Sequence, residues 1–177
     1  MSFFNIVAAT NEDTVVATYE PSKVRSDSYQ SEAELEKEFI RLLCEQGYTY
    51  LPLHTEDELI ANLRSQLEEL NHYQFSDTEW RQFFSDVIAN PNEHIPEKTR
   101  KIQDWEESKQ VLHRDDGSSK NITLIDKKNI HNNRLQVINQ YEVKQADGAR
   151  HDNRYDVTIL VNGFPLVHVE LKRRGVA

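Results

Sequence analysis

Two short apolar runs near the end of the chain, residues 157–161 and 166–171, constrain its fold more than any other feature. Val, Ile and Leu fill most of both runs, and such residues favour β-strands. The Asn-Gly pair at 162–163 lies between them. We therefore expect the two runs to form neighbouring strands of an antiparallel hairpin.

Charged residues stand at the ends of this hairpin. Asp156 heads the first strand, while Glu170 and Lys172 close the second. Because side chains alternate along a strand, Glu170 and Lys172 should share one face and Leu171 should point to the other. Two carboxylates and a lysine are a minimal set for holding a divalent cation against a phosphodiester and activating a water molecule beside it. The hairpin therefore carries a candidate catalytic site.

The two carboxylates can meet only in one hairpin register, in which Asp156 lies opposite Glu170. A regular two-residue turn at 162–163 would place them on opposite faces, because a shift of one residue reverses every side chain. The site therefore requires a loop with an odd number of residues, or a β-bulge. Pro165 cannot donate a ladder hydrogen bond, which favours the wider loop.

The expected roles follow from charge. Asp156 and one oxygen of Glu170 would ligate Mg²⁺, a hard cation that takes oxygen ligands, and the carbonyl oxygen of Leu171 would add a third ligand. Lys172 would orient the attacking water and offset the charge that builds on the phosphate.

The helix predicted to begin at Ser31 could supply a further metal ligand. Leu35 and Phe39 mark its apolar face at i and i+4. Glu36 borders that face and could reach the site, and Glu32 is its competitor. An acidic residue beside a helical stripe is more often solvated, so both interpretations stay open here.

The charged residues of the hairpin and their neighbours also have purely structural interpretations. Glu-x-Lys triplets are common on half-exposed strands, and an aspartate at the start of a strand is usually a turn residue. His168 shares the strand face of Glu170, where it either lines the site or packs as a structural histidine. A local basic patch is formed in the sequence by Arg150, Arg154, Lys172, Arg173 and Arg174. These residues either contact DNA or form only a solvated strand end.

The remaining sequence predicts an α+β fold (or α/β), with a mixed central β-sheet flanked by helices. One domain should cover residues 1–177, with a helical insert at 55–109. Helices are expected to begin at Ser31, at Thr55, at Ser76 or Asp77, and more weakly at Glu97. Strands, or in the first case an arm, are expected at 3–9, 48–53, 121–125, 134–143 and in the final pair.

Composition limits the function. A net charge of −9 argues against DNA binding by the whole surface, since phosphate neutralisation needs a basic face. The one cysteine, Cys44, lies in an apolar helical pattern and is expected in the core; it suits a reducing cytosol, so we expect a cytoplasmic protein. No signal peptide, membrane span or Gly-rich phosphate-binding loop is recognisable in the sequence.

Four stretches of the chain resemble the amino-terminal nuclease region of the restriction (R) subunit of type I restriction enzymes. They are Ser31-Glu-Ala-Glu-Leu-Glu36, Asn133-Arg-Leu-Gln-Val-Ile-Asn-Gln140-Tyr-Glu-Val, Arg154-Tyr-Asp156 and Asn162-Gly-Phe-Pro-Leu-Val-His-Val-Glu170-Leu-Lys172. The resemblance implies a PD-(D/E)xK nuclease fold and Mg²⁺-dependent cleavage of double-stranded DNA. Asp156, Glu170 and Lys172 match the family motif, and Glu36 matches its usual first-helix glutamate.

The resemblance also implies a larger assembly. Methylation and specificity subunits would choose the DNA sequence, and ATP would act only through motor domains that this chain lacks. Tyr155 replaces the family's usual proline before the aspartate, and the family's Gln-x-x-x-Tyr element beyond the lysine is missing. We expect the chain to be a fragment of a longer protein that cuts DNA poorly or not at all by itself.

Two other functions compete with this one. The acidic body and the helical insert could form a non-catalytic docking module for partner subunits. The chain could also be another PD-(D/E)xK nuclease, such as a repair or junction enzyme.

Overall fold

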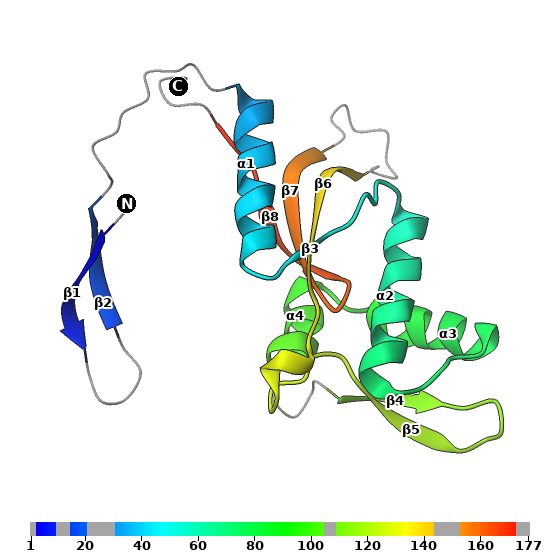
Figure 1. Ribbon diagram of the computed structural model, residues 1–177. Coiled ribbons are helices and arrows are strands. Elements are labelled where there is room, and N and C mark those ends of the chain that lie inside the picture. Colours follow the sequence, from blue (N-terminus) through cyan, green and yellow to red (C-terminus); the bar gives the residue numbers. More distant parts are fainter. Residues whose placement is uncertain (1–2, 10–14, 21–30, 105–108, 144–152, 173–177) are drawn as a thin grey trace. The chain divides into compact units, whose positions relative to one another are not determined.

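The computed structural model describes residues 3–9, 15–20, 31–104, 109–143 and 153–172. The sequence predicts one domain over the whole chain, whereas the structure divides it into two compact units, residues 1–31 and 32–177. Figure 1 shows the elements of each unit.

The first unit contains an antiparallel pair of strands, β1 (Phe3–Ala9) and β2 (Val15–Glu20). The pairing shifts register between Ile6 and Ala8. The strand expected at residues 3–9 is therefore confirmed.

A mixed four-stranded sheet is the centre of the second unit, with the order β3-β6-β7-β8. Its strands are β3 (Thr49–Tyr50), β6 (Leu135–Val143), β7 (Asn153–Val161) and β8 (Phe164–Val169). β3 runs parallel to β6, and the other neighbours are antiparallel. A separate hairpin joins β4 (Lys109–His113) to β5 (Ser119–Thr123). The predicted α+β class with a mixed sheet is confirmed.

Helix α1 (Glu32–Glu45) packs against this sheet. Leu43 joins Val137 of β6 and Val157 of β7 in a small core, with Phe39 and Ile40 packed beside them. The helix ends at Glu45, and Gly47 follows with a φ of 94°, which suits a residue without a Cβ atom. Only a narrow stripe of the helix meets the strands.

The prediction that Cys44 is a core residue is wrong, because its side chain is exposed. One residue along a helix is a rotation of about 100°, since a turn holds about 3.6 residues. With Leu43 facing the sheet, Cys44 points away from it.

The helical segment between β3 and β4 builds a second core. It contains α2 (Glu56–Asn71), α3 (Asp77–Phe83), a π-helical turn (Phe84–Ile88) and α4 (Ile95–Gln103). Thr55 caps a helix as predicted, and of the two predicted alternatives, Ser76 and Asp77, Ser76 is the cap; each forms a full capping box. The buried members of this core are Leu63, Leu67, Phe75, Trp80, Phe83, Leu112, Ile122, Leu124 and Phe164. Figure 1 shows α3, α4 and the β4–β5 hairpin in the lower half of this unit. A short 3₁₀ turn (Ile130–Asn132) leads into β6.

The turn between β7 and β8 ties the sheet to the second core. Asn162 and Gly163 adopt left-handed φ values of 50° and 83°. A Cβ on Gly163 would lie 2.7 Å from the Cα of Leu63 in α2, so only glycine fits there. The buried side chain of Asn162 accepts from the N–H of Arg134 at 2.8 Å and donates to the carbonyl of Leu124 at 3.1 Å.

A β-bulge follows this turn in β8. Val161 pairs with Phe164 and Leu160 with Pro165, but Ile159 pairs with Val167, so that Leu166 has no partner in β7. The expected wider loop is wrong, because the left-handed Asn-Gly pair closes a two-residue turn. The alternative that the site required, a bulge, is present and restores the register beyond it.

No helix among the described residues combines the length and apolar character needed to cross a bilayer.

Candidate active site

Asp156 contacts the segment that carries the Glu-x-Lys triplet. The backbone N–H of Leu171 donates a hydrogen bond to Oδ2 of Asp156 at 2.6 Å. Val157 pairs with Val169, and the same register continued by one residue places Asp156 opposite Glu170. The bulge in β8 therefore produces the alignment that the sequence required.

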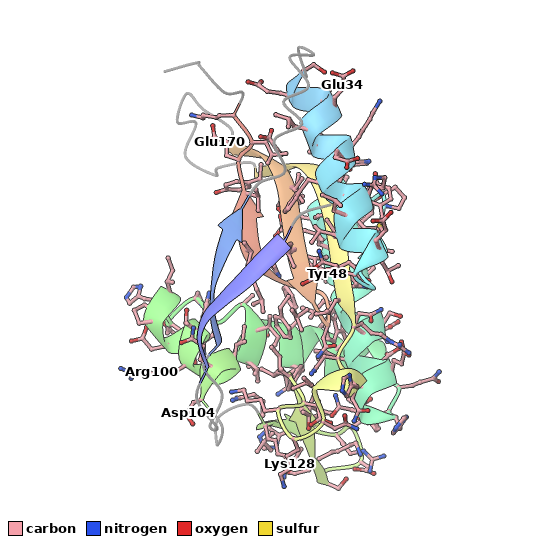
Figure 2. All side chains as sticks on the ribbon, turned by 60° about the vertical axis from the view of Figure 1, so that its left-hand side comes forward. Glu34, Tyr48, Arg100, Asp104, Lys128 and Glu170 are labelled. Atoms are coloured by element: carbon pink, nitrogen blue, oxygen red, sulfur yellow. The ribbon has the colours of Figure 1, made fainter. Side chains whose placement is uncertain are left out.

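Glu170 and Lys172 extend just beyond the last ladder pair of β8. Nζ of Lys172 lies 3.2 Å from Oε1 of Glu170, with both side chains about 70% exposed. Leu171 between them packs against the core beneath α1. The predicted alternation of these three side chains therefore holds, although regular pairing ends at Val169. Figure 2 shows Glu170 at the end of this unit where α1 begins, marked by Glu34.

Glu36 in α1 faces the sheet. Its Oε1 accepts a hydrogen bond from Nδ2 of Asn139 at 2.6 Å, and its Oε2 accepts one from Nε2 of Gln140. Both amides belong to β6, the strand beside β7. Glu32, one turn earlier, is exposed. The carboxylate of Glu36 is thus hydrogen-bonded to the sheet through β6.

Gln140 is the position of β6 that faces Asp156. Asn139 pairs with Val157 and Tyr141 with Tyr155, which leaves Gln140 and Asp156 between them. The φ of Gln140 is 55°, an uncommon value for a residue other than glycine. No role was predicted for Asn139 or Gln140. The available signal was a pair of adjacent amide side chains within a predicted strand.

His168 lies next to the candidate site. Its ring stacks on that of Tyr155 with centroids 4.0 Å apart, and its Nδ1 lies 2.9 Å from the hydroxyl of Thr158. Desolvation lowers the pKa of His168, so its imidazole is mostly neutral near pH 7. These contacts match the packed histidine that the sequence left as an alternative to a site residue.

The predicted basic patch falls largely outside the described residues, which exclude Arg150, Arg173 and Arg174. Arg154 lies in β7, paired with Glu142, but its side chain is not described. A DNA-binding role for Arg154, Arg173 and Arg174 stays a prediction.

The donor chemistry of the site is that of a hard-cation site. Carboxylate oxygens of Asp156 and Glu170 and the carbonyl of Leu171 are the ligand types that Mg²⁺ takes. Within the described part of the chain, no group of three or more His, Cys, Asp or Glu side chains is already gathered around one point. The arrangement thus offers two acidic positions on neighbouring segments, with a lysine beside one of them.

Comparison with known proteins decides the family. Residues 29–177 match the family described as the type I restriction enzyme R protein N terminus (HSDR_N). The chain belongs to this family. The resemblance drawn from the sequence is confirmed, and the chain corresponds to the N-terminal region of type I restriction enzyme endonuclease subunits.

Individual relatives agree with this assignment. The type I restriction enzyme EcoprrI endonuclease subunit of Escherichia coli is 46% identical over 172 residues, which are 97% of this chain and 53% of that protein. The SsaAORF53P endonuclease subunit of Staphylococcus saprophyticus is 37% identical over 153 residues, 84% of this chain and 15% of that protein. The SauMSSORF170P endonuclease subunit of Staphylococcus aureus is 36% identical over 154 residues. The chain therefore spans about half or less of the length of these relatives.

Proposed function

We propose that this chain carries the DNA-cleaving centre of a type I restriction endonuclease, a PD-(D/E)xK-type site that hydrolyses phosphodiester bonds of double-stranded DNA with Mg²⁺. The supporting observation is the hydrogen bond from the Leu171 N–H to Asp156. It holds one acidic residue against the segment that bears Glu170 and Lys172. The names of the relatives, which are endonuclease subunits, point the same way.

Each residue has a role that its position supports. Asp156 and Glu170 would hold Mg²⁺ with the carbonyl of Leu171, and Glu36 would add a carboxylate from the helix side. When bound, the cation supplies Lewis-acid chemistry at the phosphate and the attacking water. The Leu171 N–H occupies one lone pair of Asp156 Oδ2, so this oxygen keeps a second one for a cation.

Lys172 would contact the substrate directly. Its ammonium lies beside Glu170 and is largely exposed, so it can reach a phosphate oxygen without losing a buried partner. A cation at that place orients the attacking water and stabilises the charge that develops on the phosphate.

The proposal includes a larger complex. Methylation and specificity subunits would select the DNA, and ATP would bind only to motor domains elsewhere in the R subunit. The net charge of −9 suits a cutting module to which other domains deliver DNA. Such a complex would act in the cytoplasm.

The test is Asp156→Ala in the full-length subunit, assembled with its partner subunits. We expect DNA cleavage to fall by roughly a hundredfold or more, since even residues that only support a metal ligand contribute about 10–100-fold. ATP hydrolysis should be retained. Glu170→Ala and Lys172→Ala should behave alike, and Asp57→Ala, at an exposed carboxylate in the first turn of α2, is the matched control.

Unchanged cleavage by Asp156→Ala would contradict the proposal. It would favour the docking module, in which the acidic body serves only to hold partner subunits. Loss of cleavage together with loss of assembly, measured by gel filtration of the complex, would count against a catalytic role in the same way.

A further inference from the structure

The interface between α1 and β6 changes from apolar to polar at one point. On α1, Leu43, Ile40 and Glu36 lie on one stripe at spacings of three and four residues, and the first two pack on the sheet. On β6, Val137 and Asn139 share a strand face two residues apart. The carboxylate of Glu36 meets the amide of Asn139 at 2.6 Å, at the end of this apolar contact.

A break in strand geometry supplies a second amide. In a regular strand, Asn139 and Gln140 would point to opposite faces of the sheet. The left-handed φ of Gln140, 55°, interrupts that alternation. Both side chains consequently donate to the same carboxylate, one to each oxygen of Glu36. A costly backbone conformation is thus maintained where it brings two donors together.

A third residue holds this pair in place from the neighbouring strand. The hydroxyl of Tyr50 in β3 donates to Oδ1 of Asn139 at 2.8 Å. A carboxylate only accepts hydrogen bonds, so the NH₂ of Asn139 must face Glu36 and its carbonyl oxygen must face Tyr50. The orientation of the amide is therefore set from both sides.

The amides orient Glu36 without neutralising it. None of the ion pairs between described side chains involves Glu36 or Asp156. Each oxygen of Glu36 has two lone pairs and accepts one amide hydrogen bond, from Asn139 or from Gln140, so it can still face a cation. Gln140, one of the two donors, is also the β6 position opposite Asp156.

We infer that Asn139 and Gln140 form a carboxylate clamp, a positioning device that fixes the Glu36 side chain of α1 relative to Asp156 on β7. The inference rests on the proposed nuclease function and deepens it. The clamp residues are positioning residues, because they act through Glu36. The clamp also explains how Glu36 serves the site as a helix carboxylate.

Gln140→Gly in the full-length subunit, assembled with its partners, tests the clamp. Glycine adopts a left-handed φ readily, so this change removes the amide without backbone strain. We expect thermal stability to be retained, while the Mg²⁺ concentration for half-maximal cleavage rises by roughly tenfold or more. Asn139→Ala should raise it as well. ATP hydrolysis should not change.

A double variant separates positioning from other effects. If Gln140 acts through Glu36, then Glu36→Ala combined with Gln140→Gly should be no worse than Glu36→Ala alone. Asn62→Ala is the matched control, because it removes a different amide contact to β6, that of Asn62 in α2 with Gln136. It should leave the Mg²⁺ requirement unchanged.

The outcomes distinguish the two proposals. The clamp would be overturned if the double variant needed more Mg²⁺ than Glu36→Ala alone, by the factor that Gln140→Gly adds by itself. It would also be overturned if Gln140→Gly left the Mg²⁺ requirement unchanged. Both conclusions hold even if Asp156→Ala abolishes cleavage. A fully active Asp156→Ala variant would instead overturn the nuclease function itself.

Discussion

At the scale of single residues, Glu79 shows how a buried charge is retained in this fold. Its side chain is only 5% exposed. It accepts hydrogen bonds from the hydroxyl of Tyr73 at 2.8 Å and from the N–H groups of Ser76 and Asp115 at 3.0 and 3.1 Å. Burial by itself opposes ionisation, but these donors outweigh it and lower the pKa of Glu79 below its ordinary value of 4.5. The carboxylate thereby joins the start of α3 to the β4–β5 hairpin.

This contact predicts a pH-dependent stability. Because the folded pKa is below the unfolded one, Glu79 stabilises the protein above about pH 4.5. That contribution is lost as the pH falls through the folded pKa. Glu79→Gln turns an NH₂ group toward the N–H donors, so we expect the free energy of unfolding to fall by about 1–3 kcal/mol at neutral pH. The loss of stability on acidification should also be shallower in the variant.

Urea unfolding of the chain between about pH 3 and about pH 7 measures both effects. Asp57→Asn, at an exposed carboxylate in the first turn of α2, is the control. Equal acid dependence in Glu79→Gln and the unaltered chain would contradict this account.

At the scale of elements, the bulge in β8 allows one hairpin to combine a two-residue turn with the alignment of Asp156 and Glu170. The Asn162-Gly163 pair closes the tightest turn available, and Gly163 is held against Leu63 of α2. The extra residue Leu166 then shifts the register by one, so that Val169 pairs with Val157 and the Glu170 segment aligns with Asp156. Turn and site are thus compatible only with the bulge.

Deleting Leu166 should therefore reduce stability and cleavage far more than replacing it with alanine. Leu166 is 42% exposed, so Leu166→Ala should cost no more than about 1 kcal/mol of folding free energy. The deletion would turn Val167 and Val169 to the opposite face and separate Asp156 from Glu170. We expect it to cost several-fold more stability and to abolish cleavage by the assembled subunit.

Thermal unfolding of both variants, with cleavage assays on the assembled complex, measures the difference. A deletion variant as stable and as active as Leu166→Ala would show that the register is set by something other than the bulge.

At the scale of the whole molecule, charge is divided unevenly along the chain. Residues 1–97 contain 19 acidic and 6 basic side chains, whereas residues 98–177 contain 11 and 15. Residues 98–177 are thus mildly basic and include the candidate hairpin. Lys172, a basic residue of this segment, lies beside Glu170, but the net charge of the whole chain is −9.

This balance predicts weak DNA binding by the chain alone. Few phosphates can be neutralised, so the dissociation constant for duplex DNA at physiological salt should be about 10⁻⁴ M or weaker. Plasmid cleavage by the isolated chain with Mg²⁺ should be slow or undetectable. Fluorescence anisotropy over a salt series and a plasmid-nicking assay measure these two properties. Robust nicking at physiological salt would contradict the expectation that other domains deliver the DNA.

Local chemistry explains what the sequence determined by itself. Thr55 and Ser76 begin helices because the residues of each capping interaction lie within four positions of one another. The α+β class and the family followed from such short patterns, as did the alternation of Glu170, Leu171 and Lys172.

Only the tertiary structure decided the rest. The bulge at Leu166, the exposure of Cys44 and the hydrogen bonds between Glu36 and β6 all depend on which surface another element covers. The left-handed conformation of Gln140 is a further case, because a carboxylate from a helix about a hundred residues away in sequence accepts its hydrogen bond. Contacts of this range depend on how whole elements pack, and no local propensity encodes them.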